Sequence, residues 1–307
     1  APLSPPLPWS FRMSRVVAAL SLLALSSAFR ASPLRMKLSS ARPANVKILQ
    51  DAAAVGAAVV SEVNAAAKAA VEAKGSFCLA IPGGSVLSML SELQSPSWSA
   101  CTKLAYVNHK CVSMSDASLA THAKAEKGFL HSWADVDVLL LSGGGDAGEE
   151  AALYDAQLRD KIPLNADGLP EFDLMLIGVG DDGHVGSLYP GRDEVLEEDK
   201  LVVGVEMKTP GSISLSLPVM RAAKRVVIAA CGVSEKYPMG KSDAMKRAIE
   251  GEETLQSFPA AGLRDVAQYY LDEAAASKLS AGYSGKAEVV GSEESALDAL
   301  IEATSDL

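Results

Sequence analysis

Aromatic side chains, cysteines and, within residues 1–50, acidic side chains are scarce in this sequence of 307 residues. Aromatic residues make up 5% of the chain and hydrophobic residues 49%, which argues against disorder and predicts a mainly aliphatic core. The four cysteines are far apart and form no CxxC pair, so neither a disulfide framework nor a zinc site is indicated. We therefore expect buried or idle thiols and no metal.

Charge divides the chain into two parts. Residues 1–50 hold seven of the 28 lysines and arginines and none of the acids, so the remainder carries 21 basic and 38 acidic residues, a net charge of −17. Such an acidic body repels nucleic acid and anionic lipid, and we expect neither as a partner. A phosphorylated ligand would need a locally positive site.

Residues 1–43 have the composition of a targeting leader in front of a body of residues 44–307. Arg15, an apolar run over residues 16–25 and the small residues after it match a signal peptide, and the run is too short to span a membrane. The stretch 29–47 is basic and rich in Ser and Ala, like a transit peptide. This order resembles the bipartite leaders of secondary-plastid proteins. We expect a plastid protein, with a secreted or cytoplasmic one as the alternative, and no membrane span in the mature form.

Short apolar runs alternate with helical patterns through the body. Strands are expected at residues 45–48, 77–81, 104–107, 136–141, 172–177, 201–205, 212–217 and 225–230, and helices at 51–74, 86–93, 149–161, 218–223, 242–250 and 266–278. This alternation predicts a Rossmann-like α/β fold, with a single mostly parallel sheet and helices on both faces. No internal repeat or linker divides the body, so we predict one domain.

The candidate active site is the stretch FDLMLIGVGDDGHVGSLYPG, residues 172–191. Its apolar start is typical of a fully buried strand, and glycines, Asp182 and His184 follow directly. Open α/β sheets bind ligands at the carboxyl ends of their strands. The glycines also match GxGxxG, but Asp181 and Asp182 would place negative charge where a pyrophosphate needs bare amides. We therefore expect no nicotinamide cofactor.

Two further glycine clusters follow expected strands. Gly83, Gly84 and Ser85 stand between a strand and a helix, where free amides and the helix dipole favour an anion, although a tight connection has the same sequence. The second cluster, residues 143–145, lacks the Gly-Lys-Ser/Thr ending of a nucleotide-binding loop. We interpret it as a flexible connection.

Four motifs, in order over about residues 50–280, resemble the 6-phosphogluconolactonases, relatives of the glucosamine-6-phosphate deaminases. The stretch FDLMLIGVGDDGHVGSLYPG is similar to the signature FDL-x-x-LG-x-G-x-DGH-x-x-SLFP, and PGGSVLSML is similar to the phosphate loop and its helix. ISLSLPVMRAAKRV and YLDEAAASKL are similar to later segments. The resemblance implies the related α/β fold and hydrolysis of 6-phosphogluconolactone in the oxidative pentose phosphate pathway, with a small sugar phosphate as the partner.

That reaction needs a base to activate water, donors for an oxyanion and an anchor for the phosphate, but no metal or redox cofactor. His184 is the expected base because the pKa of a histidine lies near working pH. Asp182 is expected to orient its ring or hold its charge. The candidates for binding the substrate and its phosphate are Gly83, Gly84, Ser85, Lys110, Gly183 and Lys241.

Two segments depart from the family pattern, and a third match is ambiguous. Asn108-His109-Lys110 stands where the family usually has Asp-Glu-Arg, so Lys110 keeps a charge but lacks the arginine fork. Ser212 replaces a common arginine. The later phosphate-site lysine is Lys236 or Lys241, and spacing favours Lys241.

These departures bear on two alternatives. The aminosugar-phosphate deaminases use an aspartate in the 108–110 region to move a proton, which Asn108 cannot do, so a deaminase-isomerase is less expected. The loss of two arginines would fit a catalytically silent sugar-phosphate-binding module. The intact Asp182-Gly183-His184 argues against that alternative.

Overall fold

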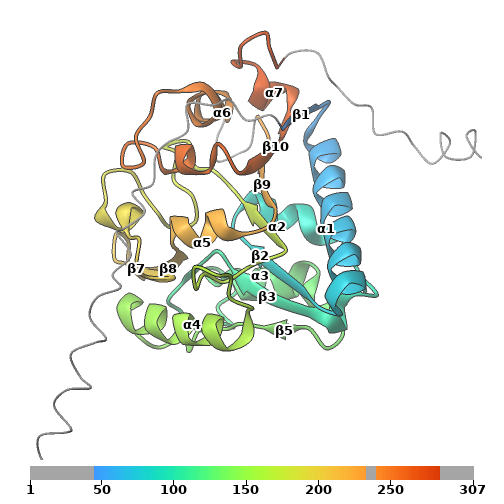
Figure 1. Ribbon diagram of the computed structural model, residues 1–307, viewed down its shortest axis with the longest axis vertical. Coiled ribbons are helices and arrows are strands. Elements are labelled where there is room, and N and C mark those ends of the chain that lie inside the picture. Colours follow the sequence, from blue (N-terminus) through green and yellow to red (C-terminus); the bar gives the residue numbers. More distant parts are fainter. Residues whose placement is uncertain (1–44, 233–239, 284–307) are drawn as a thin grey trace, which may run out of the picture. The chain divides into compact units, whose positions relative to one another are not determined.

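The computed structural model describes residues 45–232 and 240–283, whose strands form two sheets (Figure 1). The larger sheet has seven strands in the order β1-β10-β9-β6-β2-β3-β5, and all neighbours in it are parallel. Its strands are β1 (Val46–Leu49), β2 (Phe77–Ile81), β3 (Thr102–Tyr106), β5 (Asp137–Val138), β6 (Leu174–Ile177), β9 (Val226–Ala230) and β10 (Ala267–Asp272). The predicted α/β fold is confirmed. The predicted leader lies outside the described residues.

Helices connect these strands. The α-helices are α1 (Ala52–Lys74), α2 (Ser85–Met89), α3 (Thr121–Gly128), α4 (Ala147–Lys161), α5 (Leu217–Ala222), α6 (Ser242–Glu250) and α7 (Glu273–Ala276). Short 3-10 helices lie at Leu90–Glu92, Ser99–Cys101, Leu130–Ser132, Asp193–Leu196 and Pro259–Leu263. The helix expected over residues 86–93 thus ends its α-helical part at Met89, and the strand expected over residues 136–141 contains only Asp137–Val138.

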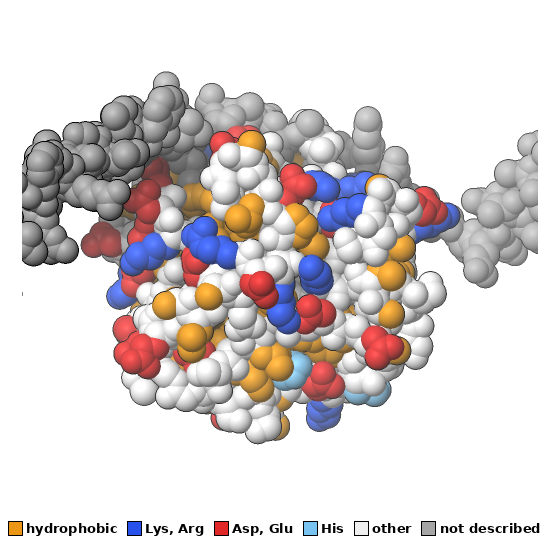
Figure 2. Space-filling model, turned by 60° about the horizontal axis from the view of Figure 1, so that its bottom comes forward, with side chains coloured by type: hydrophobic (Ala, Val, Ile, Leu, Met, Phe, Trp, Pro, Cys, Tyr) orange, Lys and Arg blue, Asp and Glu red, His pale blue; other side chains and the backbone are white. Residues whose placement is uncertain are grey.

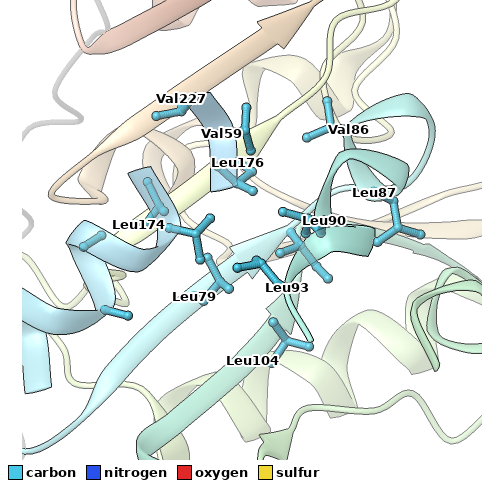
Figure 3. Close-up of a cluster of buried hydrophobic side chains, with 14 of the residues drawn as sticks. Val59, Leu79, Val86, Leu87, Leu90, Leu93, Leu104, Leu174, Leu176 and Val227 are labelled. Atoms are coloured by element: carbon cyan, nitrogen blue, oxygen red, sulfur yellow. The ribbon is translucent and has the colours of Figure 1, made fainter. Parts of the chain in front are cut away.

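The core lies between the parallel sheet and α1 and α2. Leu79, Leu174, Leu176 and Val227 point from neighbouring strands into one fully buried cluster, which Val59 of α1 completes (Figure 3). Side chains at alternate positions of a strand share one face, which explains why β2 and β6 alternate between this cluster and the opposite face. Burying each such side chain contributes about 1.5–3 kcal/mol. The aliphatic core expected from the composition is therefore the core observed.

The long helix α1 has a capping residue at each end. Asp51 accepts a hydrogen bond from the amide of Ala54 at 2.8 Å, and Gly75 ends the helix in the left-handed conformation with a φ of 72°. By length and composition α1 could cross a membrane, contrary to our expectation that no body segment could. Val59 and Val63 are fully buried in the core cluster, so in this fold α1 is a core helix.

The second sheet was not predicted. It has three antiparallel strands in the order β4-β8-β7, formed by β4 (Asn108–Lys110), β8 (Ser212–Leu215) and β7 (Val202–Val205). β4 follows β3 after a single residue, and its polar sequence has no periodicity to indicate a strand. Its pairing with β8 places Lys110 opposite Ser212 and Asn108 opposite Ser214. The departures from the family pattern are therefore neighbours in one sheet.

The helix predicted over residues 266–278 is wrong. Ala267–Asp272 forms β10, which lies between β1 and β9 and is followed by the short helix α7. The alanines of residues 274–276 suggested a longer helix. Pairing with two strands and burial of Tyr269 and Tyr270, which favour strands, override that local preference.

Candidate active site

β6 ends at Ile177, and the chain then folds into a tight loop at the carboxyl edge of the sheet. Val179 and Val185 form an isolated antiparallel bridge that closes the loop. The amide of Gly180 donates to the carbonyl of His184 at 2.9 Å, and the amide of Gly183 donates to the carbonyl of Gly180 at 3.0 Å. These backbone bonds fix the conformation of the segment that carries Asp182 and His184.

His184 and Asp182 form a hydrogen-bonded pair within this loop. The Oδ1 atom of Asp182 lies 2.6 Å from Nδ1 of the His184 ring and also accepts the amide of His184 at 3.1 Å. Because a carboxylate only accepts, Nδ1 carries the proton and Nε2 is left as the basic nitrogen. The ring is 24% exposed, so Nε2 can be reached by water or substrate.

The carboxyl of Asp182 stays ionised at neutral pH. Partial burial raises the pKa of Asp182, but the hydrogen bonds and charge of His184 outweigh burial and place that pKa below its ordinary value. An ionised carboxylate on Nδ1 orients the ring and stabilises the imidazolium that forms when Nε2 takes a proton. The predicted roles of both residues are therefore geometrically possible.

The glycines of the loop make room for aromatic rings. A Cβ atom at Gly180 would lie 2.1 Å from Nδ1 of His184. Gly183 has a φ of +88°, and a Cβ there would lie 2.3 Å from the ring of Phe258. The spacing that resembles a dinucleotide fingerprint thus makes room for the His184 ring at Gly180 and for the Phe258 ring at Gly183.

Asn108 ties the predicted phosphate loop to the histidine loop. Its Oδ1 atom accepts a long hydrogen bond of 3.5 Å from the amide of Gly83, and its Nδ2 atom donates to Oγ of Ser187 at 3.2 Å. Gly84 has a φ of 80° and a ψ of −151°, a conformation that essentially only glycine adopts, and it is exposed together with Ser85. Gly83, Gly84 and Ser85 therefore lie at the same edge as His184.

Two predicted lysines also lie at this edge. Lys241 is buried, and its Nζ atom donates to the carbonyl of Val179 in the histidine loop at 2.8 Å. Lys236 lies outside the described residues. Lys110 is half-buried on β4, with its Nζ atom 3.2 Å from the carbonyl of Pro210.

Sequence reasoning missed Lys208, which lies in the turn between β7 and β8. Its Nζ atom lies 4.8 Å from the centre of the Tyr189 ring and 3.4 Å from the Tyr189 hydroxyl. The Tyr189 ring in turn packs on His184 with a centroid distance of 4.8 Å. No local pattern marks Lys208, because only the folding of the turn over Tyr189 brings it close to the base.

The glycine cluster expected to be a flexible connection is instead tightly bound. Glu150, which is fully buried, accepts the amides of residues 143–145 at 2.7, 3.1 and 3.2 Å, and both the amide and hydroxyl of Ser142. Burial raises the pKa of Glu150, but these hydrogen bonds outweigh it and bring that pKa below its ordinary value. The loop after Leu141 is a cradle for this carboxylate.

Surface charge is mixed on one face of the molecule (Figure 2). On the face drawn in Figure 2, basic and acidic side chains are interspersed and do not separate into a patch of one sign. The face in Figure 2 therefore offers no broad basic surface that would attract an anionic ligand.

Comparison with known proteins gives a consistent result. The model of the family described as glucosamine-6-phosphate isomerases/6-phosphogluconolactonase matches residues 50–271. A 6-phosphogluconolactonase of Rattus norvegicus is 30% identical over 259 residues, 79% of this chain and 96% of that protein. One of Streptomyces coelicolor is 39% identical over 142 residues, 44% of this chain and 52% of that protein.

Solved structures agree at the level of the fold. The crystal structure of 6-phosphogluconolactonase from Leishmania guyanensis superposes with a TM-score of 0.65, covering 78% of this chain and 99% of that chain. The two are 23% identical in sequence, so this likeness shows the fold alone.

Proposed function

Because this chain belongs to the family of glucosamine-6-phosphate isomerases and 6-phosphogluconolactonases, we propose that it hydrolyses 6-phospho-D-glucono-1,5-lactone to 6-phosphogluconate. This reaction is a step of the oxidative pentose phosphate pathway. The observation that carries the proposal is the 2.6 Å pair of His184 and Asp182, which leaves Nε2 as the basic nitrogen of a side chain that is 24% exposed.

The reaction uses His184 as a proton carrier. Nε2 takes a proton from water while the water oxygen forms a bond to the lactone carbonyl carbon, and Asp182 holds the resulting imidazolium in place. The bond between that carbon and the ring oxygen then breaks, and His184 returns the proton to the departing oxygen. The products are the open sugar acid and a regenerated base.

The deaminase alternative is disfavoured by the geometry of Asn108. Both ends of its amide are engaged, one with Gly83 and the other with Ser187, and an amide does not act as an acid or a base near neutral pH. The silent binding module is disfavoured by the His184–Asp182 pair. Asp182 accepts two hydrogen bonds from His184, which orients a base that simple binding would not need.

The test measures opening of freshly made 6-phosphogluconolactone as acceleration over buffer, because this lactone also opens spontaneously. We expect His184→Ala to lose at least about 10²-fold of that acceleration, the usual contribution of a general base. His131→Ala is the matched control, since His131 lies on the 3-10 helix Leu130–Ser132 and donates from its ring to the Glu126 carbonyl.

The outcomes separate the alternatives. A His184→Ala variant that keeps most of its rate would refute the mechanism. A wild-type protein that binds 6-phosphogluconate without accelerating lactone opening would be the silent binding module.

We also propose that residues 1–43 direct the protein to a plastid. The basic, acid-free composition of the stretch after the apolar run supports this proposal. A fluorescent fusion of residues 1–47 should enter plastids of an alga with secondary plastids. Secretion of that fusion would contradict the plastid proposal and favour a secreted protein.

A further inference from the structure

Lys110 and Lys208 lie near each other without an acidic partner, since Nζ of Lys110 contacts the carbonyl of Pro210, which is two residues from Lys208. Among residues 45–232 and 240–283, no carboxylate lies within ion-pair distance of either ammonium group. The groups that do contact them are neutral: the Pro210 carbonyl for Lys110, and the hydroxyl and ring of Tyr189 for Lys208. Two cations left close together in this way repel each other, and an anion placed between them would remove the repulsion.

The pKa of Lys110 is shifted in the direction that this placement leads us to expect. Partial burial lowers the pKa of Lys110, and the charge of Lys208 lowers it further. Glu206, two residues before Lys208, forms no ion pair with either lysine, and its carboxylate accepts the amide of Ala147 at 3.0 Å at the start of α4. Positive charge therefore accumulates at this point of a chain whose body is acidic overall.

The position of the lysine pair relates it to the base. Tyr189 contacts Lys208 with its ring and hydroxyl and contacts His184 with the same ring. On the other strand, Ser212 is the residue opposite Lys110 in the β4–β8 register. Lysine is a point charge without a fork of donors, so two lysines are needed where one arginine could bind two phosphate oxygens.

We propose that Lys208 binds the phosphate group of the substrate together with Lys110, and that Tyr189 positions Lys208 beside His184. This inference rests on the proposed function, since it names the residue that recognises the phosphate. It assigns Lys208 a role in choosing phosphorylated over unphosphorylated lactones, and Tyr189 a role in holding Lys208 and the ring of His184 in one arrangement.

The first experiment compares two substrates on the full chain. Lys208→Ala should lower kcat/KM for 6-phosphogluconolactone by about 10-fold or more, the loss of one charge-assisted contact, through a higher KM. For glucono-1,5-lactone, which has no phosphate, kcat/KM should be unchanged. Lys208→Arg should restore most of the preference, and Lys68→Ala, an exposed lysine on α1, should change neither substrate.

The second experiment measures binding of inorganic phosphate by calorimetry, so that the site is tested even if neither lactone is hydrolysed. Phosphate should bind the wild-type protein and bind Lys208→Ala at least about 10-fold more weakly, with Lys68→Ala as control. Equal phosphate affinity in wild type and Lys208→Ala would overturn the inference. So would an equal loss of kcat/KM for both lactones, because a merely structural role would not depend on the phosphate.

Tyr189→Leu distinguishes the positioning role. It removes both the ring under the Lys208 ammonium and the ring against His184, so we expect a higher KM for the phosphorylated lactone and a lower kcat for both lactones. Tyr189→Phe, which keeps the ring, should retain most of both values. A Tyr189→Leu variant with unchanged KM would show that Lys208 does not need Tyr189.

Discussion

The two edges of the parallel sheet treat positive charge in opposite ways. At the amino-terminal edge, Lys74 and Lys224 both contact the buried carboxylate of Asp173, at 2.8 and 3.1 Å. Arg225, just before β9, pairs with Glu62 of α1 at 2.9 Å. Every one of these cations is matched by an acid and helps to fasten a helix or loop to the start of a strand.

At the carboxyl edge, Lys110 and Lys208 have no acid within ion-pair distance among residues 45–232 and 240–283. Lys110 and Lys208 contact a carbonyl and a tyrosine, and Lys241 donates to the carbonyl of Val179. The carboxylate present there, Asp182, is bonded to His184. Charge at the amino-terminal edge therefore stabilises the fold, whereas the unmatched charge of Lys110 and Lys208 fits the phosphate site that we propose.

The largest loss of activity should follow from filling the space beside the His184 ring. A Cβ at Gly180 would overlap the His184 ring, so Gly180→Ala must displace that ring. We expect a loss of at least about 10²-fold in lactone hydrolysis, as a misplaced catalytic group commonly causes. Gly128→Ala is the control, because a Cβ there meets nothing within 4 Å. A Gly180→Ala enzyme with normal turnover would mean that the ring position is not critical.

A substitution at the amino-terminal edge should change the stability of the protein and not its activity. Asp173→Asn removes the charge that Lys74 and Lys224 share, and we expect a loss of about 1–3 kcal/mol in the free energy of unfolding. Urea unfolding measures this, with Asp160→Asn on the exposed side of α4 as the control. If Asp173→Asn reduced kcat without reducing the free energy of unfolding, charge at the amino-terminal edge would serve activity and not stability, contrary to the comparison drawn above.

The smallest effect that we expect is on the pH dependence of stability. It comes from His109, which lies at the carboxyl edge but has both ring nitrogens hydrogen-bonded to the backbone. Buried His109 donates from Nδ1 to the Lys110 carbonyl at 2.7 Å and accepts the His122 amide at Nε2 at 3.1 Å. Protonation of Nε2 would break the second bond. Burial is also the largest cause of the lowered pKa of His109, which lies below its ordinary value of 6.5.

The sign of the pH effect follows from that lowered pKa. Below pH 6.5 the unfolded chain binds a proton at this position that the folded chain does not, so stability is full above pH 6.5 and falls as pH decreases towards the folded pKa. The slope from one proton is at most about 1.4 kcal/mol per pH unit. Unfolding at pH 5 to 7 should therefore show a shallower slope for His109→Gln than for wild type. An identical slope in both proteins would exclude His109 as a source.

Local signals in the sequence were sufficient to predict the strands and the helix of the core and the loop that carries His184. Continuous apolar runs identified β2 and β9, and the helical pattern over residues 51–74 placed α1 within one residue of its bounds, where Asp51 and Gly75 cap it. The glycines around Asp182 and His184 marked the loop, since a backbone that must turn tightly and leave room for a ring needs residues without a side chain. Each of these signals lies within a few residues of the structure it predicts.

Features that depend on distant partners were missed. β10 was taken for a helix because its alanine-rich continuation resembles one, and its identity as a strand comes from β1 and β9. The three residues of β4 become a strand only against β8. Lys208 likewise reaches the site only through Tyr189, nineteen positions away in the chain. Spacing along the sequence carries no information on such contacts.

The pairing of β1 with β10 joins the first strand of the described chain to the last one. During synthesis on the ribosome, β1 therefore emerges long before its neighbour exists, and until then β9 also presents an open edge where β10 will insert. Such contacts between distant parts of a chain form late and slowly. A nascent or truncated chain that stops before Ala267 thus displays unpaired strand edges that the finished protein hides, and unpaired edges are sites of aggregation and chaperone recognition. Because of this strand order, the sheet is completed only when β10 has been synthesised and has inserted between β1 and β9.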